Sequence, residues 1–354
     1  MTHFDIVVCG LGAMGSAALR ELSRRGLRVL GIDRFSPGHD RGSSHGATRI
    51  IRLAYFEHPS YVPLLRRTYE LWRKLEEDAK TNLLHVTGIA EMGAADGPLI
   101  QGVLAAVRTH GLQHELLSAK ELMRQFPAFQ LPSHYVGVVQ PDGGFLEAER
   151  SIHAMLALAK QTGAEIRSGE TICAITTHAS GVRIVTNRDT IEAGAAIIAA
   201  GPWIKSLLPD LRVPLRVTRQ VIAGFAPTEP AVFAHGRNPV FLIESRHGIH
   251  YGFPPDADGR IKVAKHHHRD ETVDPDAYDR SVSAADEALI RTVLSDHLPA
   301  ANGRRIEAKT CLYTVTSDGD FLIDRLPDCP QIIVASPCSG HGFKFAPVVG
   351  EILA

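Results

Sequence analysis

Phe4-Asp-Ile-Val-Val-Cys-Gly10-Leu-Gly12-Ala-Met-Gly15 joins a short apolar run to three glycines in the spacing G-x-G-x-x-G. Apolar residues at helical period follow, and a second apolar run then ends on Asp33. The order of strand, glycine turn, helix, strand and acid is far more specific than a glycine-rich turn alone. It predicts a dinucleotide-binding βαβ unit at the N-terminus.

Each residue of this pattern has a physical reason. Gly10 permits the tight turn, Gly12 lets a pyrophosphate approach the backbone, and Gly15 lets the helix pack closely on the strand. We expect the pyrophosphate on the N–H groups at the helix N-terminus, and a ribose hydroxyl on Asp33. The pattern fits NAD and FAD equally, so the choice of cofactor stays open at this point.

Length and composition limit the remaining possibilities. The 354 residues favour two packed units, and the formal net charge of -1 gives no field that would attract nucleic acid or a membrane surface. The start is not a signal peptide and no apolar stretch reaches spanning length, so we expect a cytoplasmic protein. The five cysteines lack C-x-x-C spacing, which argues against a disulfide framework or a zinc site: Cys9, Cys173, Cys311, Cys329 and Cys338.

Along the rest of the chain, periodicity predicts helices at 59–80, 98–110, 147–162 and 283–298, and a capping box at Ser118 and Glu121. Strands are predicted at 83–92, 137–140, 165–200 in short pieces, 212–227, 239–254, 261–265, 307–316, 321–324 and 331–336. The polar, glycine-rich segment 34–52 is predicted as a loop. The chain stops at Ala354 inside an expected helix, so we expect the native protein to extend further.

Three consecutive histidines, His266 to His268, invite a metal-binding interpretation. Adjacent side chains on a strand point to opposite faces, so three in a row do not converge easily on one ion. We therefore expect no metal site here.

Several of these stretches together resemble the monomeric sarcosine oxidase and N-methyltryptophan oxidase family of FAD-dependent amine oxidases, within the D-amino acid oxidase-like superfamily. The resemblance covers essentially the whole chain and favours FAD over NAD. Its carriers are Gly10 to Gly15, Ser44-His-Gly-Ala-Thr48-Arg49-Ile-Ile-Arg52, Ala200-Gly201-Pro-Trp203, Tyr251-Gly-Phe-Pro254, Lys309-Thr-Cys311-Leu-Tyr313 and Ser339-Gly340-His-Gly342-Phe343-Lys344-Phe345.

The resemblance implies an α/β fold with two domains. A Rossmann-like FAD-binding domain is expected to be discontinuous and to comprise residues 1–84, 146–212 and 305–354. A β-sheet-rich substrate domain is expected to comprise residues 85–145 and 213–304. The strand-rich pattern of 212–265 fits that second unit.

For the cofactor, the resemblance implies a covalent link between FAD and Cys311, because a thiolate near cations is a competent nucleophile. An ordinary buried strand cysteine is the alternative. Other residues implied to line FAD, beside the glycines and Asp33, are Ser44, His45, Thr48, Arg49, Gly201, Trp203, Gly340, Gly342, Phe343 and Lys344.

For the substrate, Arg52 and Lys344 match the pair that holds a carboxylate, by a guanidinium fork and a point charge. Lys262 matches the lysine that activates oxygen by its fixed charge. His266 and Tyr251 match positions near the amine, and with Arg49 they complete the implied catalytic set. Which group deprotonates the substrate is left open. The bulky, basic surroundings of His266, together with Phe56 and Leu242, depart from the sarcosine-type pocket and bear on the choice of substrate.

The expected function is oxidation of a secondary N-methyl amino acid such as sarcosine. A hydride equivalent passes to FAD, the imine hydrolyses, and O2 is reduced to hydrogen peroxide. Alternatives with the same chemistry are N-methyltryptophan, proline or pipecolate, or a glycated amino acid. Alternatives of another class are an NAD-dependent dehydrogenase and a non-catalytic FAD-binding protein. We expect a monomer whose partners are the amino acid and O2.

Overall fold

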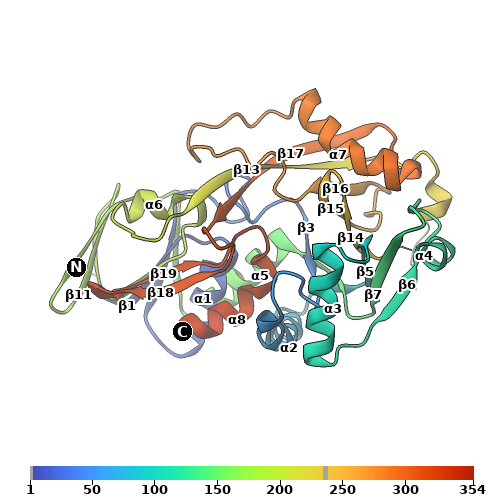
Figure 1. Ribbon diagram of the computed structural model, residues 1–354. Coiled ribbons are helices and arrows are strands. Elements are labelled where there is room, and N and C mark those ends of the chain that lie inside the picture. Colours follow the sequence, from blue (N-terminus) through green and yellow to red (C-terminus); the bar gives the residue numbers. More distant parts are fainter. Residues whose placement is uncertain (1–2, 234–237) are drawn as a thin grey trace.

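The computed structural model describes residues 3–233 and 238–354, whose strands form two large sheets and one small one (Figure 1). The first sheet has the order β10-β11-β12-β1-β2-β9, with β19 beside β12 and β18 beside β19. Its centre is parallel, since β1 pairs in parallel with β2 and β12. Its strands are β1 (His3–Cys9), β2 (Val29–Asp33), β9 (Glu165–Ser168), β10 (Ile172–His178), β11 (Gly181–Thr186), β12 (Thr190–Ile198), β18 (Leu322–Leu326) and β19 (Cys329–Ser336).

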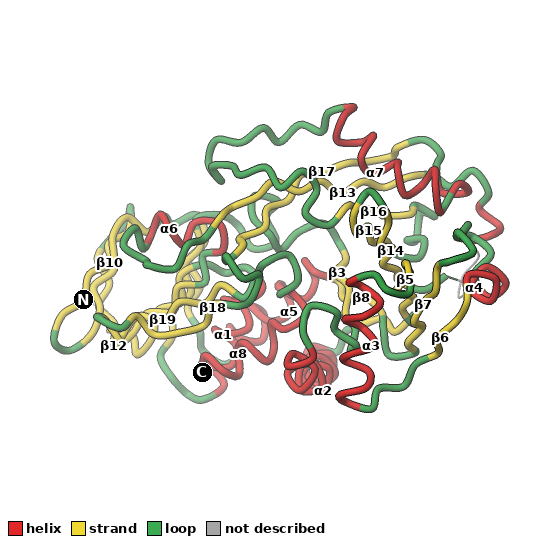
Figure 2. Tube along the Cα trace, in the orientation of Figure 1, coloured by secondary structure: helices red, strands yellow, loops and turns green. Residues whose placement is uncertain are grey.

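Helices from distant parts of the chain pack together beside this sheet (Figure 2). α1 (Ala13–Arg24) contacts α5 (Ala148–Gln161) and α8 (Ala346–Leu353), and α2 (Val62–Ala79) contacts the latter two. Gly350 of α8 lies so close to the backbone of Ala17 that an added Cβ would come within 2.7 Å of it. The end of the chain is therefore pressed against the first helix.

The second sheet has the order β17-β13-β16-β15-β14-β5-β7-β6 and is antiparallel except where β14 runs parallel to β5. A separate apolar core lies under it, with helix α7 (Ala284–His297) contributing Ile290, Val293 and Leu294. The strands are β5 (Ile89–Ala94), β6 (Glu115–Ser118), β7 (Tyr135–Gln140), β13 (Arg216–Phe225), β14 (Val240–Ser245), β15 (Gly248–Gly252), β16 (Ile261–Lys265) and β17 (Arg305–Val315).

A small third sheet joins β3 (Thr48–Ile51), β8 (Gly144–Glu147) and β4 (Leu84–Val86). The remaining helical elements are α3 (Pro98–His110), α4 (Ala119–Gln125), α6 (Ile204–Leu207), η1 (Pro59–Tyr61), η2 (Gly201–Trp203), η3 (Pro230–Phe233), η4 (Pro299–Ala301) and η5 (Phe343–Phe345). None of the helices in residues 3–233 and 238–354 is long and apolar enough to cross a bilayer.

The four predicted long helices and the capping box at Ser118 are confirmed. One loop prediction and two strand predictions were wrong. The predicted loop 34–52 contains β3, because Thr48 to Ile51 find partners in β8, about a hundred residues away. The single strand 83–92 is two strands separated by Gly88, and the single strand 239–254 is a hairpin that turns before Gly248; both glycines have positive φ.

The three histidines do not lie on a strand, since β16 ends at Lys265 and His266 to His268 form a turn. His267 has a φ of 53°, in the left-handed region. Within residues 3–233 and 238–354, no group of three or more histidine, cysteine, aspartate or glutamate side chains could hold a metal ion.

The expected domain boundaries stay a prediction. The first sheet draws its strands from the segments expected to bind FAD, and the second sheet draws most of its strands from the segments expected to bind substrate. β17, which begins at the expected boundary at residue 305, pairs along its length with β13 of the second sheet. It thus reaches from the second sheet toward the first.

The contact between Gly10 and Gly15 generates a stability prediction. A Cβ at position 15 would overlap the carbonyl oxygen of Gly10, which is backbone and cannot move aside. Gly15→Ala is therefore expected to lower the free energy of unfolding by about 1–3 kcal/mol or more, as overpacking does. Gly12→Ala is the matched control, because its Cβ would meet only Ser44 Oγ, at 3.3 Å. Thermal unfolding of both apoproteins checks this; equal midpoints would contradict it.

Candidate active site

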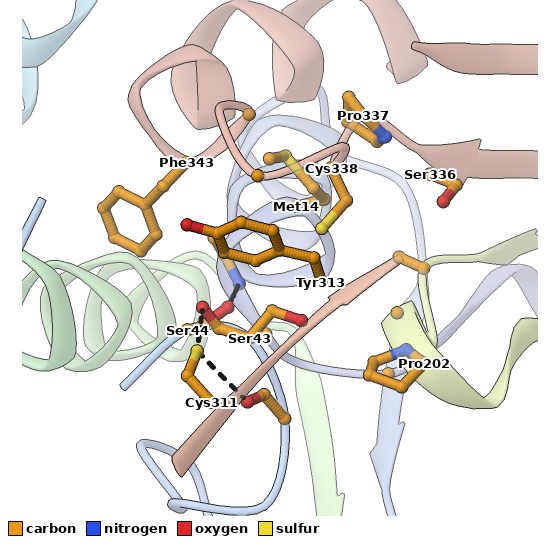
Figure 3. A pocket seen from close by; sticks show the side chains of 18 of the residues that line it. Met14, Ser43, Ser44, Pro202, Cys311, Tyr313, Ser336, Pro337, Cys338 and Phe343 are labelled. Atoms are coloured by element: carbon orange, nitrogen blue, oxygen red, sulfur yellow. Dashed lines mark hydrogen bonds between the residues drawn. The ribbon is translucent and has the colours of Figure 1, made fainter. Parts of the chain in front are cut away.

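A cavity of about 380 Å³ runs from the glycine turn of the first sheet to the β14–β15 hairpin of the second. Figure 3 shows part of its lining, where Cys311 and Tyr313 of β17 lie near Ser43 and Ser44. Distant segments of the chain thus surround one space. Its two ends differ in chemistry.

The glycine end is built to receive a group close to the backbone. Gly10 has a φ of 96°, and the space beside Gly12 is open except for Ser44 Oγ. The carboxylate of Asp33 accepts hydrogen bonds from the N–H of Leu11 at 2.6 Å and from the N–H of Phe35 at 2.8 Å. Asp33 therefore holds the glycine turn in place and retains lone pairs for a ribose hydroxyl.

The middle of the cavity contains Cys311. Its Sγ lies 3.8 Å from the carbonyl oxygens of Gly42 and Ser43, and 3.9 Å from Arg49 Nη2 (Figure 3). Burial raises the pKa of the thiol, and Arg49 opposes that rise. The group is therefore protonated near neutrality, and a nucleophilic reaction would have to begin with loss of that proton.

Arg49 uses its guanidinium to hold the loop that carries it. Nη2 donates to the carbonyl oxygens of Ser43 and His45, and Nη1 donates to that of Thr48. The guanidinium carbon lies 5.9 Å from the centre of the Phe343 ring. Arg49 lines the cavity, but most of its donors face backbone oxygens.

Lys262 is half-buried and points toward the same loop. Nζ donates to the carbonyl oxygens of Gly46 and Thr48, both at 2.8 Å, and lies 4.0 Å from the centre of the Phe253 ring. Burial, with the charge of Arg49, lowers its pKa well below the usual lysine range. Lys262 does not itself line the cavity.

His45 follows the cavity-lining residue Ser44 and is nearly fully buried. Burial and Arg49 lower its pKa to about 3, so its ring is neutral. Within the described residues, neither ring nitrogen has a hydrogen-bond partner, and neither has Ser43 Oγ. Buried polar atoms of this kind normally have partners, so this region suits a ligand that donates and accepts hydrogen bonds.

The far end of the cavity holds a buried ion pair. Arg52 Nη2 donates to both oxygens of Glu57, at 2.7 and 2.8 Å, and Nη1 donates to the carbonyl of Ala54. Burial raises the pKa of Glu57, but the charge of Arg52 and its hydrogen bonds lower it more. The pKa of Glu57 is therefore about 2. The same pairing raises the pKa of Arg52 against the effect of burial. Both groups are charged at neutral pH.

Lys344 lies beside this pair, and its side chain is also buried. Nζ donates to the carbonyl of His341 at 2.7 Å and to the hydroxyl of Tyr55 at 3.2 Å, and no carboxylate of the described residues lies within 4.0 Å of it. Burial, with the charge of Arg52, lowers its pKa to about 7. A negative ligand at this position would raise that pKa again.

Tyr55 connects Lys344 to His341. His341 Nε2 lies 3.0 Å from the carbonyl of Gly319, so it must carry the proton, and Nδ1 then accepts from the Tyr55 hydroxyl at 2.7 Å. Burial lowers the pKa of His341 to about 4, in agreement with a neutral ring. Lys344, Tyr55 and His341 therefore form one chain of hydrogen bonds with defined donors.

An apolar wall lies beside these charges, supplied by the second sheet together with Ile50 of β3 and Phe56 of the loop after it, and the guanidinium carbon of Arg52 lies 4.7 Å from the centre of the Phe56 ring. His266 lies beside this wall, and burial, with the neighbouring His267, lowers its pKa to about 3. Burial also raises the pKa of Tyr251, so its phenol keeps its proton. The apolar side chains that line this wall are Ile50, Phe56, Leu242, Ile249, Tyr251 and Phe253.

Most of the predicted site residues meet in this cavity. Those that line it are Gly10, Gly12, Asp33, Ser44, Arg49, Arg52, Gly201, Trp203, Tyr251, His266, Cys311, Gly340, Gly342, Phe343 and Lys344. Those that do not line it are Gly15, His45, Thr48 and Lys262. Gly15 serves the packing of α1 and the other three lie just behind the cavity wall.

Four residues at the substrate end were missed in the sequence analysis: Tyr55, Glu57, Glu91 and His341 as a partner of Tyr55. Glu57 follows Arg52 by five residues and is a nearby acid of opposite charge. Glu91 is a charged residue within an otherwise apolar run, which is a visible signal for a buried polar site. The hydrogen bond from Tyr55 to His341 spans 286 residues and has no local signal.

Comparison with known proteins agrees with this geometry. The family described as FAD dependent oxidoreductase matches residues 5–354, so the chain belongs to that family and is an FAD-dependent oxidoreductase. The chain is 38% identical to monomeric sarcosine oxidase of Streptomyces avermitilis, over 99% of this chain and 92% of that protein. It is 35% identical to N-methyl-L-tryptophan oxidase of Salmonella typhi, over 99% of this chain and 94% of that one.

Solved structures are similar over the whole chain. NikD, an unusual amino acid oxidase essential for nikkomycin biosynthesis, superposes with a TM-score of 0.88 at 28% identity, covering 100% of this chain and 93% of that one. L-proline dehydrogenase from P. horikoshii superposes with a TM-score of 0.86 at 21% identity, covering 99% and 92%, and shares the fold. The expected α/β fold and the resemblance to FAD-dependent amine oxidases are thereby confirmed.

The hydroxyl of Tyr55 generates a prediction about the hydrogen-bond chain. Tyr55→Phe removes one partner each from Lys344 Nζ and His341 Nδ1, and unpartnered buried groups cost about 1–3 kcal/mol of stability. Tyr278→Phe is the control, because within the described residues the buried Tyr278 hydroxyl has no partner. Denaturant unfolding is expected to show a loss for the first variant and little change for the second. Equal losses of stability in the two variants would contradict the hydrogen-bond chain through Tyr55.

Proposed function

We propose that this protein oxidises a secondary N-methyl amino acid with FAD as the hydride acceptor and O2 as the electron acceptor. The observation that carries the proposal is the position of Arg52 and Lys344. Two buried cations lie at one end of a cavity whose other end is a dinucleotide-binding glycine turn. The names of the relatives at 33–38% identity support the same substrate class.

The residues present fit FAD. The open backbone at Gly12 and the first N–H groups of α1 would hold the pyrophosphate, and Asp33 would hold a ribose hydroxyl. The hydroxyl of Ser43, which lines the cavity and has no hydrogen-bond partner among the described residues, offers a donor and an acceptor near Cys311. Bound FAD would supply the acceptor for the hydride and would pass its electrons on to O2.

Two cations of the cavity would bind the substrate carboxylate. Of five N–H donors on Arg52, Nη2 gives two to Glu57, Nη1 gives one to Ala54, and Nε faces Glu91. Of three on Lys344, two are used. Among the described residues, the second N–H of Arg52 Nη1 and one N–H of Lys344 therefore have no partner, which matches the two oxygens of one carboxylate. Binding would draw Lys344 into its ammonium form.

The substrate nitrogen must lose a proton before its carbon can give up a hydride. His266, with a pKa of about 3, is a poor base, and Tyr251 keeps its proton, so both would orient the amine. The apolar wall would exclude water and receive the N-methyl group. It also favours a second candidate, an N-methyl or cyclic amino acid with an apolar side chain.

Lys262 would serve the reaction with oxygen by a positive charge. Its two carbonyl partners stabilise the ammonium form, and a negative charge on a reduced cofactor would raise its lowered pKa. We also propose the domain division given above, in which residues 1–84, 146–212 and 305–354 bind FAD, and a monomer that releases hydrogen peroxide.

The assignment of Cys311 as the covalent attachment point of FAD has a direct test. Acid denaturation is expected to leave flavin with the precipitated parent protein and to release it from Cys311→Ala. Cys338→Ala is the matched control, because Cys338 also lines the cavity (Figure 3) and should keep its flavin. Equal release from all three proteins would rule out the link.

The proposed function is tested by adding sarcosine to the purified yellow protein without oxygen and following the flavin absorption band. Bleaching is expected, with recovery and hydrogen peroxide on admission of air. N-methyltryptophan and proline, added separately, distinguish small from large and cyclic substrates. A protein that binds FAD and is bleached by none of them would overturn the proposal.

A further inference from the structure

Glu91 is a buried acid that the proposed reaction does not use. It lies on β5 behind the lining of the substrate end, where its register partner on β14 is the cavity-lining Leu242. The side chain has no exposed area, and within the described residues neither carboxyl oxygen has a hydrogen-bond partner. Its contact with a charged group is Arg52 Nε, at 3.6 Å, which is too long for a hydrogen bond.

The surroundings explain the protonation state of this carboxyl. Arg52, which attracts it, is already paired with Glu57, and Lys344 is the other cation that acts on it. The neighbours across β7 and β14 are uncharged: Val138 and Leu242 directly opposite, and Gln140 on the same face two residues along. Burial therefore outweighs the attraction and, with the repulsion of Glu57, raises the pKa of Glu91 to about 8.

An unpaired buried carboxyl is costly, and no backbone or side-chain hydrogen bond of the described residues offsets that cost. We propose that Glu91 is a specificity-determining residue of the substrate site: its carboxyl shares Arg52 with the substrate and, by holding or losing one proton, sets how strongly the site prefers a substrate that carries a carboxylate. This inference rests on the proposed function, and specifically on Arg52 as the carboxylate anchor.

Glu91 and the substrate carboxylate compete for the guanidinium of Arg52. While Glu91 is protonated, Arg52 carries one full counter-charge, Glu57, and its remaining donor attracts a substrate carboxylate. Once Glu91 ionises, two carboxylates surround Arg52, and a third is repelled in a region where little water screens the charges. A substrate without a carboxylate feels neither effect. The preference for carboxylate over neutral substrates should therefore fall as pH rises through the pKa of Glu91.

The experiment compares sarcosine with its primary amide on the FAD-loaded enzyme, for the parent and for Glu91→Gln. The quantity is the ratio of kcat/KM for the two substrates between pH 6.5 and 9. At pH 6.5 the two proteins should agree, because glutamine mimics the protonated acid. At pH 9, about one unit above the pKa, the ratio for the parent should be about tenfold lower than for the variant.

The ratio cancels effects that are common to both substrates, such as oxidation of the cofactor. The comparison with the variant removes the titration of Lys344, Glu57 and His341, because both proteins share these groups. Glu307→Gln is the matched control, since it removes an exposed carboxylate from β17 of the same sheet and should follow the parent. Identical pH profiles for the parent and Glu91→Gln would overturn the inference. If neither substrate reduces the flavin, the proposed function fails instead.

A second measurement does not depend on turnover or on the folding of a variant. The infrared band of a protonated carboxyl group in the parent protein is expected to persist at pH 7 and to disappear with a midpoint near 8. A protein with no such band at pH 7 would contradict the inference whatever the kinetics show. A band that persists in Glu91→Gln would assign the proton to another carboxyl and would also contradict it.

Discussion

The close approach of α1 to the end of β1 is the constraint on which the rest of the structure depends. The carbonyl of Gly10 occupies the position that a side chain at residue 15 would need, and Ala17 meets Gly350 of α8 in the same way on another side of the helix. Small residues on two sides of α1 thus fix its N-terminus at the mouth of the cavity. They also fix α8, and with it the preceding segment from Pro337 to Phe345, which forms another wall of the same cavity.

The opposite end of the cavity depends on electrostatics among buried and partly buried groups. Four ionisable groups lie together there, and burial acts on their pKa values in different directions. Arg52 and Glu57 pair and stay charged, whereas the pKa of Lys344 falls to about 7 and that of Glu91 rises to about 8. The fold therefore buries one strong ion pair and two groups poised near neutrality, which is less costly than four fixed charges.

The sequence predicted the features whose signals are local. The glycine turn, Asp33, the four long helices and the capping box at Ser118 follow from spacing and periodicity within a few residues. β3 was missed because its strand character comes from pairing with residues 144–147 and not from its own polar composition. The direction of Lys262 could not be predicted either, since its amine bonds to carbonyl groups 216 and 214 residues earlier in the chain.

The identity of single site residues was predicted better than the contacts between them. Arg52 and Lys344 were paired through the resemblance, and the cavity brings them together. Glu57 and Glu91, which decide how much of the charge of Arg52 is available, were not predicted. Glu57 lies in a loop, and Glu91 lies in a segment that was predicted only as a strand. Only the three-dimensional structure reveals that both acids face the same guanidinium.

Arg49 and Arg52 illustrate why partners decide function where residue type does not. Both arginines come from the segment 34–52, and both line the cavity. Arg49 donates to three backbone oxygens of its own loop and thereby shapes the wall around Cys311. Arg52 meets the carboxylate of Glu57, the carboxyl group of Glu91 and one carbonyl, and keeps a donor for a ligand. One segment thus supplies Ser44 beside the helix N-terminus, Arg49 beside the thiol and Arg52 beside the apolar wall. These three residues line successive parts of the cavity in the order in which they occur in the chain. Ser44 and Arg49 would thus help to hold the cofactor, and Arg52 would hold the carboxylate of a substrate.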